Sequence, residues 1–127
     1  MSSRSRSPHD AAAAAARPAP AARPGWHVPA FTVTELGARQ SRYCVCVFVL
    51  NEGPRILAQL ERMRAPAAGV DIVIADGGST DGALAPATLT SLGVRALLVK
   101  TGPGKLSAQM RMALAWALDQ GYDGVIT

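Results

Sequence analysis

The sequence contains no apolar run of the length that a membrane span requires. Its longest strongly apolar run, Cys44–Leu50, is much shorter than the ~20 residues of a transmembrane helix. The first residues include arginines but no apolar segment, so we expect no secretory signal. Their acid-poor, Arg- and Ser-containing composition permits a transit peptide, although the many Ala and Pro residues fit a disordered extension better.

Cysteine and histidine are equally scarce, with two of each in the chain. Cys44 and Cys46 are two positions apart in an apolar run, so on a strand both would face the same side. This is not the Cys-x-x-Cys spacing of metal sites, and His9 and His27 stand alone. The pattern favours buried free thiols in a reducing, cytoplasmic compartment over a metal site or a disulfide.

The positive charge lies in the N-terminal third of the chain. Residues 43–127 contain seven basic and seven acidic side chains, so the formal net charge of +4 belongs to residues 1–42. In that segment six arginines outnumber two acids: Arg4, Arg6, Arg17, Arg23, Arg39 and Arg42 against Asp10 and Glu35. A nucleic-acid-binding fold is expected to carry a basic face on its folded part, so we expect no nucleic-acid partner.

Composition divides the chain at about residue 42. Residues 1–28 hold an alanine run and then prolines that break helices, with no periodic apolar face to bury, and we expect them to be disordered. Residues 29–42 carry no pattern that assigns them a structure. We therefore treat residues 1–42 as a disordered Ala/Pro/Arg-rich extension and residues 43–127 as the folded domain.

Four apolar runs predict parallel strands: Tyr43–Leu50, Val70–Ala75, Val94–Val99 and Gly124–Thr127. The starts of these runs are about 24 to 30 residues apart, which is the length of a βαβ unit. Helical patterns lie between them. The first begins near Pro54 with Ile56, Leu57, Leu60 and Met63 and ends at Pro66, and a short one spans about 84–92 with Pro86 in its first turn. The last has a stripe of Leu106, Met110, Ala113, Leu114 and Ala117 and ends at Gly121. This alternation predicts an α/β fold with a parallel, doubly wound, Rossmann-like sheet.

Ligands of such sheets bind where the strands end, so the residues after each strand are the candidate site. Asp76 is either a base contact or part of a helix-capping turn. Glu52 either faces the crevice or complements a helix dipole. Lys105 is either a diphosphate contact at a helix N-terminus or a solvated surface lysine. We interpret Arg111 as surface charge.

These loops resemble those of family 2 glycosyltransferases of the GT-A fold, including dolichyl-phosphate mannosyltransferase-like proteins. Asn51-Glu52 match the end of that family's Pro-x-Tyr-Asn-Glu turn, with Phe48 and Leu50 in place of the proline and tyrosine. The run from Asp76 to Gly82 is similar to Asp-Asp-Gly-Ser-Thr-Asp-Gly, with Gly77 in place of the second acid. The segment from Gly102 to Ala113 is similar to the family's Lys-Gly-Leu-Gly-x-Ala segment, and Lys105 lies near its basic position.

The resemblance covers residues 43–127 and implies the N-terminal, donor-binding part of a sugar transferase that uses a UDP- or GDP-sugar. It implies nucleotide-binding positions at Leu50, Glu52, Asp76, Gly77, Asp81 and Lys105. The family's metal-binding Asp-x-Asp would follow Thr127, so we expect the Mg²⁺ or Mn²⁺ of a longer enzyme not to be bound by these residues. We likewise expect no catalytic residue within them and no transfer by residues 1–127 alone, and at full length the enzyme could be membrane-associated.

Two alternatives stay open. One is a non-catalytic nucleotide-binding or interaction module. The other is a dinucleotide-binding oxidoreductase domain, suggested by Gly102-x-Gly104-x-x-Ser107, although in that class the glycine loop follows the first strand of its unit. The same loop is not a Walker A motif, because Lys105 is followed by Leu106.

Overall fold

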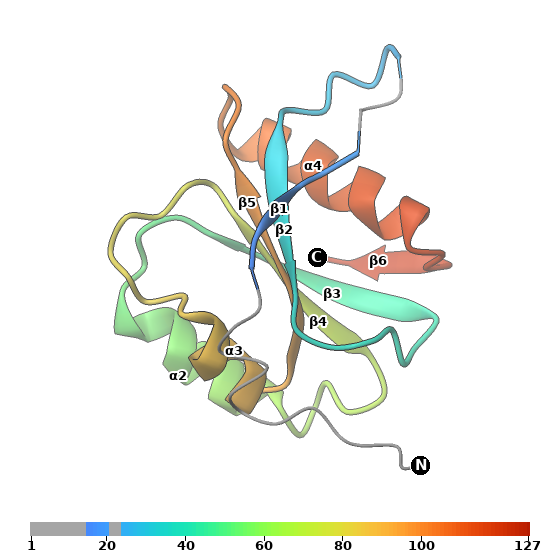
Figure 1. Cartoon of the computed structure of the whole chain (residues 1–127). Helices are drawn as coiled ribbons and strands as arrows, with labels where there is room; N and C mark the ends of the chain where they lie inside the picture. Colours follow the sequence, from blue (N-terminus) through green and yellow to red (C-terminus); the bar gives the residue numbers. More distant parts are fainter. Residues whose placement is uncertain (1–14, 21–23) are drawn as a thin grey trace.

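The computed structural model describes residues 15–20 and 24–127. They form an α/β fold with a six-stranded mixed sheet and three helices (Figure 1). The strands are β1 (Arg17–Pro18), β2 (Phe31–Glu35), β3 (Tyr43–Val49), β4 (Asp71–Asp76), β5 (Val94–Lys100) and β6 (Gly124–Ile126). The helices are α2 (Pro54–Met63), α3 (Pro86–Ser91) and α4 (Leu106–Asp119). No helix in these ranges is long and apolar enough to cross a membrane.

The sheet is mostly parallel, in the order β1-β2-β5-β4-β3-β6. The pairs β5–β4, β4–β3 and β3–β6 are parallel, while β2 runs antiparallel to β5 and to β1. The four strands predicted from the apolar runs are all present, with ends within one residue of those expected. Parallel pairing places the carboxyl ends of β3, β4 and β5 at one edge of the sheet.

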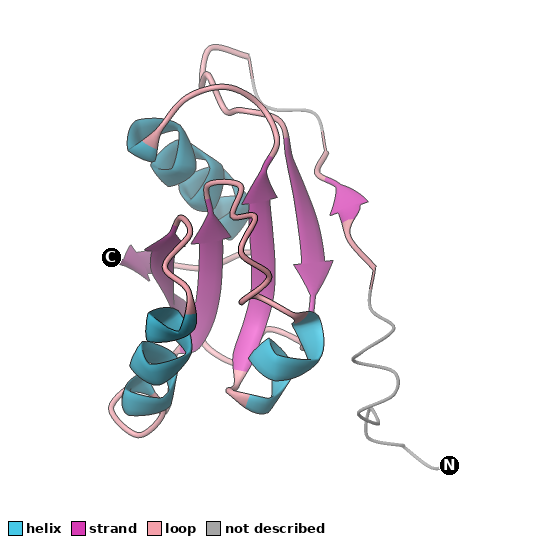
Figure 2. Ribbon diagram, turned by 90° about the vertical axis from the view of Figure 1, so that its left-hand side faces the viewer, coloured by secondary structure: helices cyan, strands magenta, loops and turns pink. Residues whose placement is uncertain are grey.

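Helices cover both faces of the sheet (Figures 1 and 2). On one face, Met112 and Trp116 of α4 pack on Val73, Ala75 and other buried residues of the central strands. On the other face, α2 and α3 bury Ile56, Leu60 and Leu89 against the strands. Every residue of β4 is therefore buried, which explains why its sequence does not alternate between polar and apolar residues.

The structure corrects the expected boundary at residue 42. Residues 31–35 form β2, which pairs along the edge of β5 through five residue pairs, and Arg17–Pro18 pair with β2 in turn. Phe31 and Val33 add to the core under α4, so their burial offsets the entropy of ordering this short segment. The expected disorder of residues 1–14 and 21–23 concerns residues outside the described part.

Two helices begin at a proline, as expected. Pro54 and Pro86 lie in the first turns of α2 and α3, where a missing N–H removes no helical hydrogen bond. The helix α2 buries Ile56 and Leu60 and half-buries Leu57 and Met63, as its periodicity predicted. Its last helical residue, Met63, comes three residues before Pro66.

The predicted apolar stripe of α4 is only partly correct. Ala113 and Ala117 are buried, but Leu106, Met110 and Leu114 are exposed. The face that packs on the sheet instead carries Ala108, Gln109, Met112 and Trp116. Because α4 is apolar almost all round, periodicity alone did not determine which face is buried. The small alanines allow close approach to the strands, and this orients the large Trp116 inward.

At the amino-terminal edge of the sheet, a buried polar cluster joins the elements. Tyr122 Oη donates to Asp71 Oδ2 at 2.5 Å, and Gln40 N donates to the same oxygen at 3.0 Å. The Arg95 guanidinium lies over the rings of Trp116 and Tyr122, at 4.8 and 5.8 Å from their centroids. Beside this cluster, Cys44 and Cys46 are buried free thiols, as predicted.

Candidate functional site

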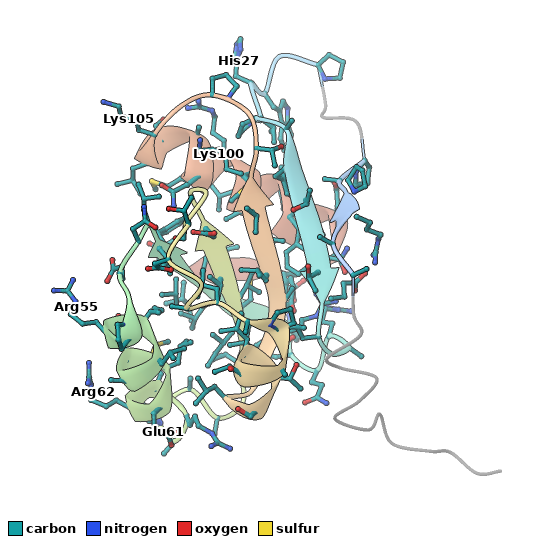
Figure 3. The ribbon with its side chains drawn as sticks, turned by 60° about the vertical axis from the view of Figure 1, so that its left-hand side comes forward. His27, Arg55, Glu61, Arg62, Lys100 and Lys105 are labelled. Atoms are coloured by element: carbon teal, nitrogen blue, oxygen red, sulfur yellow. The ribbon has the colours of Figure 1, made fainter. Side chains whose placement is uncertain are left out.

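Three loops follow the parallel strands at the same edge of the sheet. Loop A comprises residues 50–53 after β3, loop B residues 77–85 after β4, and loop C residues 101–105 after β5. Parallel strands with helices on their faces place ligand sites at this edge. Lys100 and Lys105 lie at this end of the molecule, whereas Glu61 and Arg62 lie toward the other end of α2 (Figure 3).

Loops A and B are joined by hydrogen bonds between side chains and backbone. Asn51 N donates to Ser79 Oγ at 2.8 Å, and Thr80 N donates to Asn51 Oδ1 at 2.8 Å. Gly53 N donates to Asp81 Oδ2, also at 2.8 Å. Asn51 adopts a positive φ of 50°, a conformation that asparagine tolerates better than most residues. The two motifs that the sequence analysis singled out therefore form one connected structure.

Asp76 is the last residue of β4 and is only 3% exposed. Its Oδ1 accepts from Ser79 Oγ at 2.6 Å, and both carboxylate oxygens lie within 3.1 Å of Ser79 N. The carboxylate thus forms a capping turn within loop B. It also lines a small pocket of about 250 Å³ between loop B and β5, together with Ser79, Asp81, Gly82, Leu84, Ala85, Leu97 and Val99.

Of the other predicted site residues, Asp81 holds loop A and Leu50 and Glu52 are more open. Hydrogen bonds from the backbone N–H groups of Ala83 and then Gly53 lower the pKa of the exposed Asp81 carboxyl. Leu50 is 55% exposed. Glu52 is partly buried and forms an ion pair of 3.4 Å with Arg55 in the first turn of α2. Leu50 and Glu52 thus leave a solvent-open surface above β3.

Close packing around loop C leaves no room for side chains at its glycines. Thr101 N and Gly102 N both donate to Ala30 O at 2.9 Å. A Cβ at Gly102 would lie 2.8 Å from Ala30 N, and a Cβ at Gly104 would lie 2.5 Å from the Cβ of Ala108. The first amide of the near-fingerprint, that of Gly102, is therefore already bonded to Ala30 O.

The basic residues near loop C differ in availability. Lys100 Nζ donates to Gly102 O at 2.9 Å and so closes its own loop. Arg111 bonds to His27 O at 3.0 Å and to Ser107 Oγ at 2.5 Å, which fastens residue 27 to α4. Lys105 is exposed at the N-cap of α4. No side chain caps that helix end, and its first turn has no acid, so its positive end is uncompensated.

Gln109 is a site residue that the sequence analysis missed. It lies in the first turns of α4 and is 5% exposed. Its Nε2 donates to Val49 O at 3.2 Å and to Ala75 O at 3.1 Å, the last residue of β3 and the next-to-last of β4. A Cβ at Gly77 would lie 3.0 Å from Gln109 Cδ. The one available signal was a polar residue next to small residues near the start of an apolar helix.

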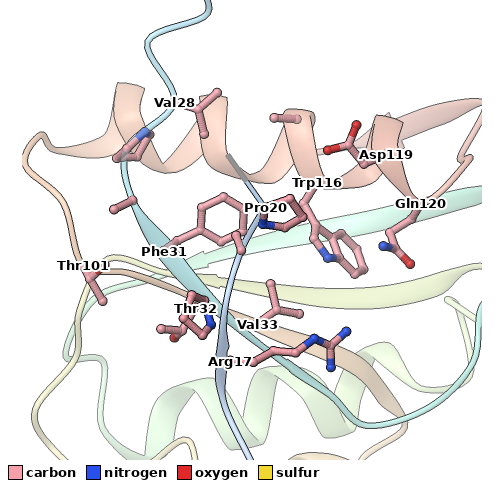
Figure 4. Close-up of a pocket in the computed structure, with 15 residues that line it drawn as sticks. Arg17, Pro20, Val28, Phe31, Thr32, Val33, Thr101, Trp116, Asp119 and Gln120 are labelled. Carbon is pink, nitrogen blue, oxygen red and sulfur yellow. The ribbon is translucent and has the colours of Figure 1, made fainter. Parts of the chain in front are cut away.

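A larger cavity lies away from loops A and B. It measures about 650 Å³ and is bounded by residues 17–20 and 28–33 on one side and by α4 on the other (Figure 4). Phe31, Val33 and Trp116 form much of its wall, and Thr101 is its one residue from the three loops. It is separate from the site predicted at the strand ends.

No group of three or more His, Cys, Asp or Glu side chains that could hold a metal ion exists within residues 15–20 and 24–127.

Comparisons with protein-family models, with curated protein sequences and with solved structures found no match to this chain.

Proposed function

We propose that the chain binds the nucleoside diphosphate part of a nucleotide sugar, as the donor-binding part of a family 2 glycosyltransferase of the GT-A fold. The observation that carries the proposal is the connection of loops A and B at the carboxyl edge of β3 and β4. A crevice above parallel strands, bordered by ordered polar loops, is the usual nucleotide site of α/β sheets.

The strand order supports a doubly wound interpretation. The parallel strands follow the order β5-β4-β3-β6, so the chain first proceeds outward from β3 to β5 and then crosses to the other side of β3. Such a reversal between β3 and β6 is a topological switch point, where ligands of open α/β sheets bind. Loop A, with Leu50 and Glu52, leaves β3 at this point.

The N-terminus of α4 supports a diphosphate position. Its free first-turn amides and the exposed Lys105 present positive charge without a neighbouring acid in that turn, and this combination suits a phosphate group. Asp76 would act indirectly in this arrangement. Its carboxylate fixes Ser79, and Ser79 in turn accepts the backbone hydrogen bond of Asn51 that holds loop A.

The test is a titration of the 127-residue chain with UDP, GDP and NAD⁺, followed by amide chemical shifts. We expect UDP or GDP to shift signals of loops A and B and of the first turn of α4. Asp76→Ala should weaken this binding by about 1 to 3 kcal/mol, the scale of losing a charged hydrogen bond. Glu61→Gln is the matched control, because Glu61 is exposed on α2 and pairs only loosely with Arg64, at 3.7 Å.

Two results would contradict the proposal. One is binding of NAD⁺ without any response to nucleoside diphosphates, which would favour an oxidoreductase domain. The other is a set of shifts confined to the cavity bounded by Phe31 and Trp116, because that cavity is separate from the strand ends.

A further inference from the structure

The side chain of Gln109 has a fixed orientation at the ends of β3 and β4. Its terminal nitrogen lies 3.2 Å from Val49 O and 3.1 Å from Ala75 O. Only the nitrogen of an amide can donate, so two carbonyl partners determine which end of the group faces the strands. Turning the amide over would set its oxygen against both carbonyls and lose both hydrogen bonds. Gln109 is therefore held with its oxygen directed away from the two carbonyls.

The amide group of Gln109 lies against Gly77. A Cβ built on Gly77 would be 3.0 Å from Gln109 Cδ and 3.1 Å from both Nε2 and Oε1, so the amide fills space that any side chain at position 77 would need. Within the described part of the chain, the only buried side-chain nitrogen or oxygen atoms without a hydrogen bond belong to Arg95. Both bonds of Gln109 are made by Nε2. Its oxygen is thus an acceptor without a hydrogen-bond partner among the described residues, at the ends of β3 and β4.

We infer that Gln109 Oε1 accepts a hydrogen bond from the nucleobase, and that it selects bases with a ring N–H, such as uracil and guanine. This inference rests on the proposed function and names its substrate class. An acceptor that cannot turn over pairs with N3–H of uracil or N1–H of guanine. Cytosine N3 and adenine N1 are themselves acceptors and would face Oε1 with no hydrogen between them.

The absence of a side chain at Gly77 is part of the same arrangement. Asp76 at the end of β4 and Asp81 in loop B, the carboxylates before and after Gly77, already accept hydrogen bonds from loops A and B. Gln109 therefore supplies from α4 a neutral acceptor at the place where Gly77 supplies none. Binding of the base would then depend on the contact between α4 and loop B.

The experiment measures dissociation constants of nucleoside monophosphates for the 127-residue chain. The wild type should bind UMP or GMP about tenfold more tightly than CMP and AMP, the scale of one hydrogen bond against an unpaired buried partner. Methylation of the ring nitrogen, in 3-methyl-UMP or 1-methyl-GMP, should remove this preference. Comparison of the UMP and GMP arms distinguishes the two bases.

Gln109→Met keeps the length of the side chain but removes the acceptor. In this variant the penalty for ring methylation should fall from about tenfold to about twofold or less. Gln59→Met on α2 is the matched control and should keep the full penalty. If Gln109→Met does not fold, Gly77→Ala serves instead, because its new Cβ would lie 3.0 Å from Gln109 Cδ and displace the amide.

The outcomes separate the two proposals. A chain that binds UMP and 3-methyl-UMP equally well, and GMP and 1-methyl-GMP equally well, still binds nucleotides, but the role of Gln109 is then wrong. The same holds if a folded Gln109→Met protein keeps the full methylation penalty. Failure of the wild type to bind any nucleotide would overturn the proposed function and this inference together.

Discussion

Tyr122 makes the stability of this fold dependent on pH at the alkaline end. Its hydroxyl is buried and donates to Asp71 at 2.5 Å. Burial and the hydrogen bond to this carboxylate raise the pKa of Tyr122 above its ordinary value of 10.0. The unfolded chain releases the phenolic proton above pH 10 while the folded chain retains it. The stabilisation is therefore complete below pH 10 and is lost as the pH rises beyond it.

Tyr122→Phe tests this argument. At pH 7 the variant loses a hydrogen bond to a charged group and leaves Asp71 with Gln40 N as its remaining donor, so we expect a loss of about 1.5 to 3 kcal/mol of unfolding free energy. Above pH 10 the difference should shrink by up to about 1.4 kcal/mol per pH unit, the value for one proton. The assay is urea unfolding of both proteins between pH 7 and 11.

The comparison of the two proteins isolates Tyr122, because every other titrating group is present in both. Parallel pH profiles of the wild type and the variant above pH 10 would show that Tyr122 does not retain its proton in the fold. A loss below about 0.5 kcal/mol at pH 7 would show that the hydrogen bond to Asp71 contributes little net stability.

Three further changes have defined outcomes. Gly104→Ala should destabilise the fold by about 2 kcal/mol in urea unfolding, because φ is +109° and the new Cβ would lie 2.5 Å from that of Ala108; an unchanged midpoint would contradict this. Arg95→Met should change stability by less than about 1 kcal/mol, since two unpaired buried nitrogens offset its ring contacts, its hydrogen bond to Gln120 and its ion pair with Glu35; a loss above 3 kcal/mol would refute this balance. Asn51→Ala should broaden the amide signals of loop B, because it removes the acceptor for a loop B amide; unchanged signals would show that the loops are ordered independently.

The parallel strands were predictable because burial on both faces leaves a simple record in the sequence. The residues of β4 are all buried, so its run of apolar residues from Ile72 to Ala75 is unbroken. Pro54 and Pro86 likewise determine helix starts through backbone chemistry that needs no tertiary context. These signals are local, and the structure follows them within one or two residues.

By contrast, β2 was not predictable from local signals. Its five residues alternate, but Phe31–Glu35 follow a long Ala/Pro-rich segment and precede a loop, with no helix beside them. The strand is stable because the edge of β5 is open to it and because Phe31 and Val33 complete the core under α4. Both conditions belong to the assembled sheet and are not encoded within the segment.

The candidate site shows the same division between local and tertiary information. Asp76, Asp81 and Asn51 were identifiable because they lie at or shortly after the ends of strands, and position relative to a strand end is a sequence property. Gln109 is 33 residues beyond Asp76, and its role depends on which face of α4 is buried. That face is selected by the close packing of Ala113 and Ala117 on the strands, although an equally apolar face with Leu114 was available. A polar residue on a helix that is apolar all round can therefore be assigned to a site only after the rotation of the helix is known.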